Sequence, residues 1–232
     1  MNVLITGASR GLGLALVETF LHDGHTVFAG VLLHEKQLLG NIKANYGNKL
    51  TVLEMDVTDE SAIKKHAKAM QTFTLDVIIN NAGIIFGGKN TDDVLQEIDF
   101  AELATSMDVN VYGGMRVVKY FTPLLYKSEH GMLLNITSEA GSQEMAAGCY
   151  DPYNLSKTMM NIVSTKMKAL MKSRNIYVFA IHPGRMKTDM SGGMGDITPQ
   201  VSARGIVDIA VGKIKITPSE KFVNYLGEPM VY

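Results

Sequence analysis

Cysteine is nearly absent from this 232-residue sequence, in which Cys149 stands alone. A single cysteine excludes an internal disulfide, and its scarcity fits a reducing compartment. A lone free cysteine is more often a small buried side chain than a nucleophile, so Cys149 is a weak catalytic candidate.

A basic surplus and a long apolar run are also missing. The formal net charge is −1, which gives no support for binding to nucleic acid or to an anionic membrane. No apolar stretch reaches the roughly 18 residues that span a bilayer, and no basic leader precedes the first apolar run. We therefore expect a soluble, cytoplasmic protein that needs neither a metal nor a disulfide for its core.

Short apolar runs alternate with longer amphipathic segments along the whole chain. Runs that are apolar for most of their length are typical of parallel strands covered on both faces. The alternation predicts the α/β class, with a single doubly wound domain over residues 1–232 and a parallel sheet of about seven strands between two layers of helices. We expect strands at 3–5, 26–29, 50–55, 77–79, 132–136, 178–181 and 222–224, and helices near 11–22, 35–45, 60–71, 101–125, 152–173 and 200–212.

A glycine-rich turn follows the first expected strand. Residues 6–13 read TGASRGLG, with glycines in G-x-x-x-G-x-G spacing. Such a turn lets backbone N–H groups and a helix N-terminus approach a pyrophosphate without obstruction by side chains. A tight turn without a ligand is the alternative, but the position between a strand and an apolar-faced helix favours a dinucleotide. The expected contacts are Gly7, Ser9, Arg10, Gly11, Leu12 and Gly13.

Tyr153 and Lys157 are the candidate catalytic pair. They lie four residues apart on an expected helix, so both face the same side, where an ammonium group can stabilise a phenolate. This spacing is common by chance, but two other strand ends support it. Ser138 follows the run 132–136, and residues 80–83, NNAG, follow the run 77–79. In parallel sheets these ends meet at the ligand-binding edge.

Taken together, these motifs resemble the short-chain dehydrogenase/reductase family in its basic single-domain, Rossmann-type form. The resemblance covers nearly the whole chain, and the runs 187–190 and 225–229 are further similar to the small C-factor-like carbonyl reductases. It implies that Tyr153 transfers a proton to or from the substrate oxygen and that Ser138 hydrogen-bonds this oxygen. Lys157 would lower the Tyr153 pKa and hold the nicotinamide ribose, while Asn110 would kink the helix 101–125 and hold a water in a proton relay.

The same resemblance implies the remaining cofactor contacts. Asp56 and the Val57 backbone would bind the adenine, although Asp56 could instead start a helix, a role for which Asp59 is better placed. The other expected contacts are Asn80, Ala82 and Gly83 along the adenine ribose, and Pro183, Gly184, Met186 and Thr188 along the nicotinamide.

The cofactor is expected to be NADP or NAD, with NADP favoured. NAD-preferring relatives usually carry an acid at the end of the second strand, and here no acid occurs before Glu35. The arginine of many NADP-preferring relatives is missing too, because Leu32 stands in its place. Arg10 is expected to meet a 2′-phosphate, with help from His34.

The substrate region is less well defined. Arg185, where such relatives often have a bulky apolar residue, could favour an anionic substrate or point to solvent. Relatives form dimers or tetramers through the helices 101–125 and 152–173, so we expect a homodimer or homotetramer. Residues 86–88, 139–150 and 190–197 would shape the pocket, with Glu144, Met145 and Tyr150 as candidates.

These expectations favour a carbonyl reductase or alcohol dehydrogenase acting on a small molecule. The alternative is a nicotinamide-binding sensor or signalling protein with little turnover, because a fold does not determine a function. A sugar-nucleotide epimerase or dehydratase is less favoured, because the sequence after Thr188 is too short for another substrate domain.

Overall fold

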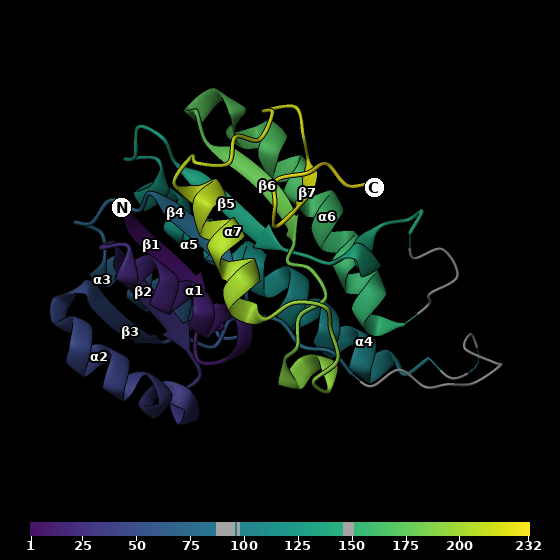
Figure 1. Cartoon of the computed structure of the whole chain (residues 1–232), viewed down its shortest axis with the longest axis horizontal. Coiled ribbons are helices and arrows are strands. Elements are labelled where there is room, and N and C mark those ends of the chain that lie inside the picture. The colour runs from purple at the N-terminus through teal and green to yellow at the C-terminus, as the bar shows by residue number, and fades with distance from the viewer. Residues whose placement is uncertain (87–95, 97, 146–150) are drawn as a thin grey trace.

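The expected alternation folds into one seven-stranded parallel sheet in the computed structural model, which describes residues 1–86, 96, 98–145 and 151–232 (Figure 1). The strand order is β3-β2-β1-β4-β5-β6-β7, and every pairing is parallel. The order reverses between β1 and β4, which is where open sheets of this kind bind ligands. The strands are β1 (Asn2–Thr6), β2 (Thr26–Val31), β3 (Leu50–Glu54), β4 (Val77–Asn80), β5 (Met132–Ile136), β6 (Tyr177–His182) and β7 (Phe222–Asn224).

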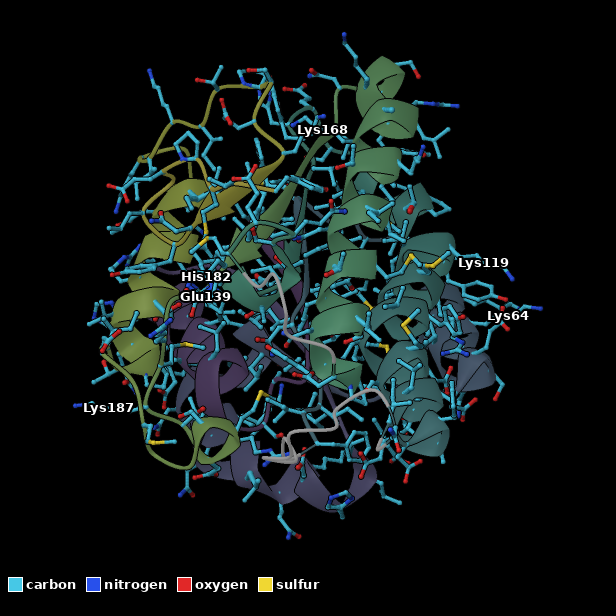
Figure 2. The ribbon with its side chains drawn as sticks, turned by 90° about the vertical axis from the view of Figure 1, so that its right-hand side faces the viewer. Lys64, Lys119, Glu139, Lys168, His182 and Lys187 are labelled. Atoms are coloured by element: carbon cyan, nitrogen blue, oxygen red, sulfur yellow. The ribbon has the colours of Figure 1, made fainter. Side chains whose placement is uncertain are left out.

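Helices cover both faces of this sheet, which confirms the predicted fold class. One apolar core joins the sheet to α1 and α7, and the second joins it to α3, α5 and α6. Figure 2 shows α6 running beside the element that contains α4 and α5. The helices are α1 (Gly11–His22), α2 (Gly40–Tyr46), α3 (Glu60–Ala69), α4 (Phe100–Met107), α5 (Gly114–Leu125), α6 (Pro152–Met171) and α7 (Pro199–Ala210).

Two expected helices differ in detail from those observed. The segment after β2 begins as a 3-10 helix, η1 (Leu33–Leu39), and becomes α-helical only at α2. The expected helix 101–125 is divided by a π-helical segment, η3 (Asp108–Gly113). This irregularity confirms the expected kink at Asn110. Shorter 3-10 segments are η2 (Gly47–Lys49), η4 (Glu139–Gly141), η5 (Lys172–Arg174) and η6 (Asp189–Ser191).

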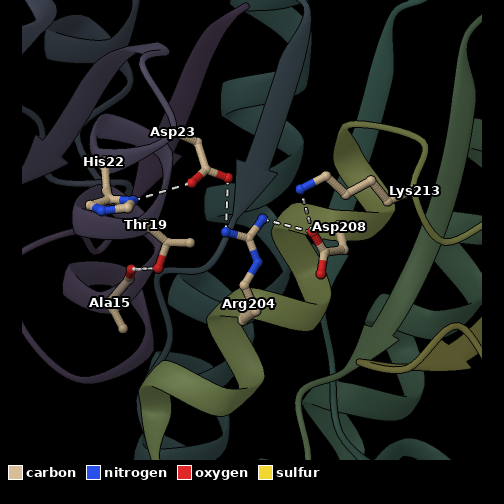
Figure 3. A network of polar contacts seen from close by, with 7 residues as sticks. All are labelled: Ala15, Thr19, His22, Asp23, Arg204, Asp208 and Lys213. Carbon is tan, nitrogen blue, oxygen red and sulfur yellow. Dashed lines mark hydrogen bonds and ion pairs between the residues drawn. The ribbon is translucent and has the colours of Figure 1, made fainter.

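The helices α1 and α7 are joined at the surface by a charged network (Figure 3). Arg204 on α7 donates to Asp23, the C-cap of α1, at 2.8 Å and to Asp208 at 2.7 Å. Lys213 approaches Asp208 at 3.4 Å. Exposed ion pairs contribute little individually, so the apolar contact beneath them is the main source of stability. None of the helices in the described residues is long and apolar enough to cross a membrane.

Gly205 marks the closest approach of α7 to the segment after β7. A Cβ added there would lie 2.2 Å from the carbonyl oxygen of Tyr225. We predict that Gly205→Ala lowers the free energy of unfolding by about 1–3 kcal/mol, because overpacking outweighs the better helix propensity of alanine. Gly40→Ala is the matched control in α2, since nothing lies within 4 Å of its added Cβ. Chemical denaturation of both variants measures the difference, and equal stabilities would contradict the close packing.

Candidate active site

A cavity of about 630 Å³ opens at the carboxyl edge of the sheet, beside the switch between β1 and β4. Most of the residues expected to bind a cofactor line it, and Tyr153 and Lys157 lie in its wall. The other lining residues among those expected are Gly7, Ser9, Arg10, Gly11, Leu12, Gly13, Asp56, Val57, Ala82, Gly83, Pro183, Met186 and Thr188. Asn80, Asn110, Ser138 and Gly184 are not among the lining residues.

The glycine-rich turn is packed too tightly for side chains at two of its positions. Gly7 has a positive φ of 63°, and a Cβ there would lie 2.7 Å from the Cα of Ala82. A Cβ at Gly13 would lie 2.0 Å from the carbonyl oxygen of Gly7. Gly11 differs, because its added Cβ meets only the Thr188 Cγ2, at 3.8 Å, and so a side chain there would enter the cavity. The glycine-rich turn therefore leaves an open cradle at Gly11, between this turn and the segment that contains Thr188.

Asn81 ties this turn to the segment that follows β4. Its Nδ2 donates to the carbonyl oxygens of Thr6 and Gly7 at 2.9 and 3.0 Å. The Thr6 hydroxyl accepts from the backbone N–H groups of Asn81 and Ala82 at 3.1 and 3.0 Å. Asn81 stood within the NNAG run but was not singled out from the sequence. Asn81 lines the cavity and holds the glycine-rich turn against the segment that follows β4.

Asn80 points the other way, into the interior. Its Nδ2 donates to the Asn135 Oδ1 at 2.8 Å and to the Gly114 carbonyl at 3.3 Å, and the residue is 6% exposed. The structure thus gives the Asn80 side chain a supporting position beneath the cavity. Its expected contact with the adenine ribose stays a prediction.

The catalytic pair is presented by the first turns of α6. Asp151 caps this helix by accepting from the Asn154 N–H at 2.9 Å, and Pro152 occupies its first turn, where a missing N–H costs nothing. Tyr153 and Lys157 therefore lie on one face. The Lys157 Nζ donates to the Ile136 carbonyl at 3.0 Å and lies 5.4 Å from the centroid of the Tyr153 ring.

Ser138 is held near this pair by the close packing of η4 against α6. A Cβ at Gly141 would lie 2.7 Å from the backbone carbon of Lys157, so only glycine allows the contact. Asn161 reinforces it by donating to the Gly141 carbonyl at 3.1 Å. The Ser138 Oγ accepts from the Ala140 N–H at 3.1 Å and interacts with the Tyr153 side chain. Gly141 was not recognised from the sequence, where it is an ordinary loop glycine.

Burial shifts the pKa values of both catalytic groups, in opposite directions. It lowers the pKa of Lys157 to about 8, because the charged ammonium loses its hydration. It raises the pKa of Tyr153, since the phenolate would lose hydration too, and the carboxylates of Asp151 and Glu139 add to the rise. A hydrogen bond with Ser138 acts against this and lowers the Tyr153 pKa. The phenol is therefore protonated at neutral pH in the free protein.

Asn110 lies in the π-helical segment and clamps the chain after β4. Its Oδ1 accepts from the Ile84 N–H at 2.8 Å, and its Nδ2 donates to the Ile84 carbonyl at 3.0 Å and the Ser156 Oγ at 2.9 Å. Ser156 in turn donates to the Tyr153 carbonyl at 2.7 Å. Ser156 is a further residue that sequence reasoning missed, although it lies inside the Tyr153–Lys157 run. Through it, Asn110 is connected to the catalytic helix.

The segment after β6 forms the opposite wall. Gly184 has a φ of 83° and packs against Ile197, so it turns the chain without lining the cavity. The Arg185 side chain is 68% exposed, as the solvent-facing alternative expects, and its Nε donates to the Glu139 Oε1 at 2.6 Å. His182, which is nearly buried, accepts from the Glu139 N–H at 3.0 Å through its Nδ1. Figure 2 shows His182 and Glu139 side by side at this end of the sheet.

The wall that is expected to face the adenine is formed by the segment after β3. Asp56 accepts from the N–H and hydroxyl groups of Thr58, both at 2.8 Å, and lies in the cavity wall. Asp59 is the N-cap of α3 and accepts from the N–H groups of Ser61 and Ala62. Asp56 is therefore not needed to start that helix, and the alternative reading of this residue is excluded.

Part of the expected substrate region falls outside the described residues. Cys149 and Tyr150 belong to the segment 146–150, and residues 87 and 88 belong to 87–95, so their predictions are untested. Glu144 and Met145 are exposed, the latter by 55%. Met186 and Met190 line the cavity together with Ile84, Ile85 and Val109. Among the described residues, no group of three His, Cys, Asp or Glu is arranged to hold a metal ion.

Lys157 makes a measurable contribution to the pH dependence of stability. Its pKa is about 8 when folded and 10.5 in a model peptide. Below pH 8 the group is protonated in both states and its burial destabilises the fold. Between pH 8 and 10.5 the unfolded chain binds more protons, so the free energy of unfolding rises with pH.

We therefore predict that Lys157→Met raises the free energy of unfolding at pH 7 by about 1–3 kcal/mol and removes this rise. Lys166→Met, at an exposed position on the same helix, is the control. Urea denaturation at pH 7, 8.5 and 10 gives both quantities. A free energy of unfolding that falls in Lys157→Met but not in Lys166→Met would contradict the conclusion that burial of the Lys157 ammonium destabilises the fold.

The fold and this site define the class of parallel-sheet proteins that bind ligands at a strand switch point. A family model described as short chain dehydrogenase matches residues 1–196. The chain belongs to this family. It is 34% identical over 194 residues to the human 17-beta-hydroxysteroid dehydrogenase type 2, a match that covers 82% of the chain and 48% of that protein. The chain thus spans about half the length of that relative.

Two solved structures are similar over the whole chain. The NADPH-bound carbonyl reductase from chicken fatty liver has a TM-score of 0.88 and 26% identity, with 100% of this chain and 98% of that chain covered. The carbonyl reductase Sniffer of D. melanogaster has a TM-score of 0.89 and 25% identity, with 100% and 99% covered. These matches confirm the family resemblance seen in the sequence.

Proposed function

We propose that the protein is a carbonyl reductase or alcohol dehydrogenase that uses NADP or NAD. The observation that carries this proposal is that Tyr153 and Lys157 lie in the wall of a cavity that the glycine-rich turn also lines, with Ser138 hydrogen-bonded to the Tyr153 side chain. The NADPH in the name of the chicken structure supports the same cofactor class. The substrate is a small carbonyl compound or alcohol.

The residues present fit a nicotinamide dinucleotide. The cradle at Gly11 opens toward the cavity, as a pyrophosphate requires. Thr137 lies in the cavity wall, and its buried hydroxyl has no hydrogen-bond partner among the described residues. Asp56 and Val57 would hold the adenine, and Lys157 and Thr188 the nicotinamide half.

Tyr153 then acts as the general acid or base. A bound nicotinamide dinucleotide would supply or accept the hydride exchanged with the carbonyl carbon. In reduction, the protonated Tyr153 phenol donates its proton to the substrate oxygen while Ser138 hydrogen-bonds the same oxygen. In oxidation, Tyr153 accepts that proton, and the Lys157 ammonium stabilises the phenolate. Asn110 positions the catalytic helix through Ser156 and would hold the water that relays protons from solvent.

We predict that Tyr153→Phe lowers kcat by about 10²–10⁴-fold, because the proton donor is lost. The dissociation constant for NADPH or NADH should change little, since the other residues of the cavity wall are kept. Tyr177→Phe, at the start of β6 and far along the sheet from the cavity, is the control. NAD(P)H absorbance over a panel of ketones and aldehydes measures turnover, and fluorescence titration measures binding.

Two outcomes of this experiment would contradict the proposal. Turnover retained by Tyr153→Phe would exclude this mechanism. Wild-type protein that binds the dinucleotide tightly but turns over no carbonyl or alcohol would favour the sensor or signalling function instead.

The ion pair between Arg185 and Glu139 bears on the charge of the substrate. Arg185 precedes the cavity residue Met186, and Glu139 follows Ser138, so the pair lies between the two loops that flank the reacting end. A neutralised Arg185 offers little attraction to an anion. The described lining at this end is apolar, with Ile85, Val109 and Met190. We therefore propose a neutral, apolar carbonyl substrate.

We predict that Glu139→Gln raises kcat/KM for a 2-oxo acid relative to its neutral methyl ketone by about 3–10-fold, because it frees Arg185 in a partly exposed setting. Any effect of Glu139 on the Tyr153 pKa applies to both substrates and cancels in the ratio. Glu18→Gln, with the same charge change at an exposed position on α1 outside the cavity lining, is the control. An unchanged ratio for both variants would show that Arg185 does not act on the substrate.

Self-association and location remain proposals as well. Exposed apolar side chains lie along the helices expected to form the interface, including Phe100 at 74%, Met115 at 43% and Met159 at 39% exposure. They support a homodimer or homotetramer built through α4, α5 and α6. A cytoplasmic location is proposed from the composition.

A further inference from the structure

His182, the last residue of β6, has an imidazole close to Ser138 that the proposed mechanism does not use (Figure 2). The residue is 9% exposed, and its Nδ1 accepts from the Glu139 N–H at 3.0 Å. A backbone N–H can only donate, so this contact requires an unprotonated Nδ1 and places the proton of the ring on Nε2. The Nε2 lies 4.0 Å from the Glu139 Oε2. The structure therefore holds His182 as a neutral imidazole in one tautomer.

The hydrogen bond to Glu139 continues the pairing of β5 with β6 beyond the ends of the two strands. The Thr137 N–H donates to the Ile181 carbonyl at 2.8 Å, which fits the parallel register. Ser138 follows with an extended backbone. The next N–H, that of Glu139, donates to the His182 side chain. Ser138 is thus held between two anchors, one made by the backbone of β6 and one made by an imidazole.

The anchor at Glu139 lies at the turn that orients the Ser138 hydroxyl. η4 begins directly after Ser138, whose Oγ accepts from the Ala140 N–H at 3.1 Å. The same hydroxyl hydrogen-bonds the Tyr153 side chain. If the Glu139 N–H lost its acceptor, a partly buried donor would be left without a partner, which favours a shift of the turn. Such a shift would change the position of the Ser138 hydroxyl relative to Tyr153.

We propose that the neutral imidazole of His182 positions Ser138 against the substrate oxygen, acting through the Glu139 backbone. This inference rests on the proposed function and adds a positioning residue to it. A protonated imidazole carries hydrogen on both nitrogens, so its Nδ1 opposes the Glu139 N–H instead of accepting from it. Ser138 is then displaced, and carbonyl reduction slows on the acid side. The loss falls on kcat, because the hydrogen bond from Ser138 strengthens as charge develops on the oxygen.

The surroundings of His182 determine the pH at which this loss occurs. Burial has the largest effect and lowers the His182 pKa below its ordinary value of 6.5. Glu139 on η4 acts against this shift, whereas Arg185 in the segment after β6 adds to it. On the side of β7, Asn224 is paired with His182 in the sheet register and hydrogen-bonds Glu228. The imidazole is therefore neutral at pH 7, and kcat should fall only below pH 6.5.

The test is the pH profile of kcat for reduction of a ketone between pH 5 and 8, at a saturating concentration of NADPH. His182→Asn places an amide oxygen near the position of Nδ1 and does not titrate in this range. At pH 7.5 it should keep kcat within about threefold of the wild type. From pH 7.5 to pH 5 the wild type should lose about threefold or more, and His182→Asn should not.

His182→Phe keeps a ring of similar size but offers no acceptor to the Glu139 N–H. It should lower kcat by about tenfold or more at every pH, with little change in KM, because Ser138 is displaced throughout. A general loss of stability would not be restored by His182→Asn. The kcat of the asparagine variant thus separates the hydrogen bond from the packing of the ring.

His130→Asn is the matched control, because His130 is exposed and precedes the opposite end of β5. It should retain the acid loss of the wild type. Tyr153 and Lys157 do not cause this loss, since both are more fully protonated at lower pH and reduction requires a protonated phenol. Titration of the dinucleotide is common to all the variants, so it cancels when their profiles are compared.

Two further measurements locate the titrating group. NMR of the protein without a dinucleotide gives the pKa of the His182 imidazole, which should match the pH at which kcat falls. Glu139→Gln removes the charge that favours the protonated ring, so it should move both the NMR transition and the loss of kcat to lower pH.

Wild-type kcat in His182→Phe would overturn the proposal, because Ser138 would not depend on the imidazole. An acid loss that persists unchanged in His182→Asn, or that disappears equally in His130→Asn, would also overturn it, since another group would be responsible. Absence of turnover by the wild type, with the NMR titration of His182 still observed, would instead overturn the proposed function.

Discussion

The buried ammonium of Lys157 is the constraint on which the rest of the active site depends. It is 5% exposed, and among the described residues its Nζ donates to the Ile136 carbonyl, at the end of β5. An ammonium group in such surroundings loses much of its hydration, which is why its pKa falls to about 8. The fold tolerates this loss of hydration because neighbouring residues hold the Lys157 ammonium group in place. The folded state is therefore destabilised at Lys157, whose Nζ lies 5.4 Å from the centroid of the Tyr153 ring.

Small residues make that arrangement possible by letting backbones approach the lysine. The Cβ of any residue replacing Gly83 would lie 3.6 Å from the Lys157 Nζ and 3.2 Å from the Asn110 Oδ1. Gly141 brings η4 against the backbone of α6 in the same way. The ends of β4 and β5 therefore converge on one point of the catalytic helix. The π-helical segment completes the arrangement, since Asn110 reaches both Ile84 and Ser156 from it.

The sheet, its helical layers and the main motifs could be predicted because they depend on periodicity and on residue types with a strict steric purpose. A glycine turn after a strand, or a tyrosine four residues before a lysine, can be interpreted from the sequence alone. The direction in which a side chain points cannot be inferred in this way. Asn80 and Asn81 are identical in the sequence, yet one bonds to Asn135 in the interior and the other to the glycine turn. Their alternation follows from the strand geometry of β4, but which face lies toward the cavity depends on the register of the whole sheet.

The effect of a charged residue is the property hardest to infer from the sequence, because it depends on how far neighbouring opposite charges neutralise that residue. The sequence presents Arg10 and Arg185 as two cations near the expected ligand. In the structure each faces a carboxylate that is distant in sequence, Glu35 in one case and Glu139 in the other. Each carboxylate in turn contacts a further residue, Ser9 of the glycine-rich turn in one case and His182 at the end of β6 in the other. Both ends of the cavity are consequently closer to neutral than a count of arginines implies. An anion that enters at either end must therefore compete with a carboxylate that is already in position.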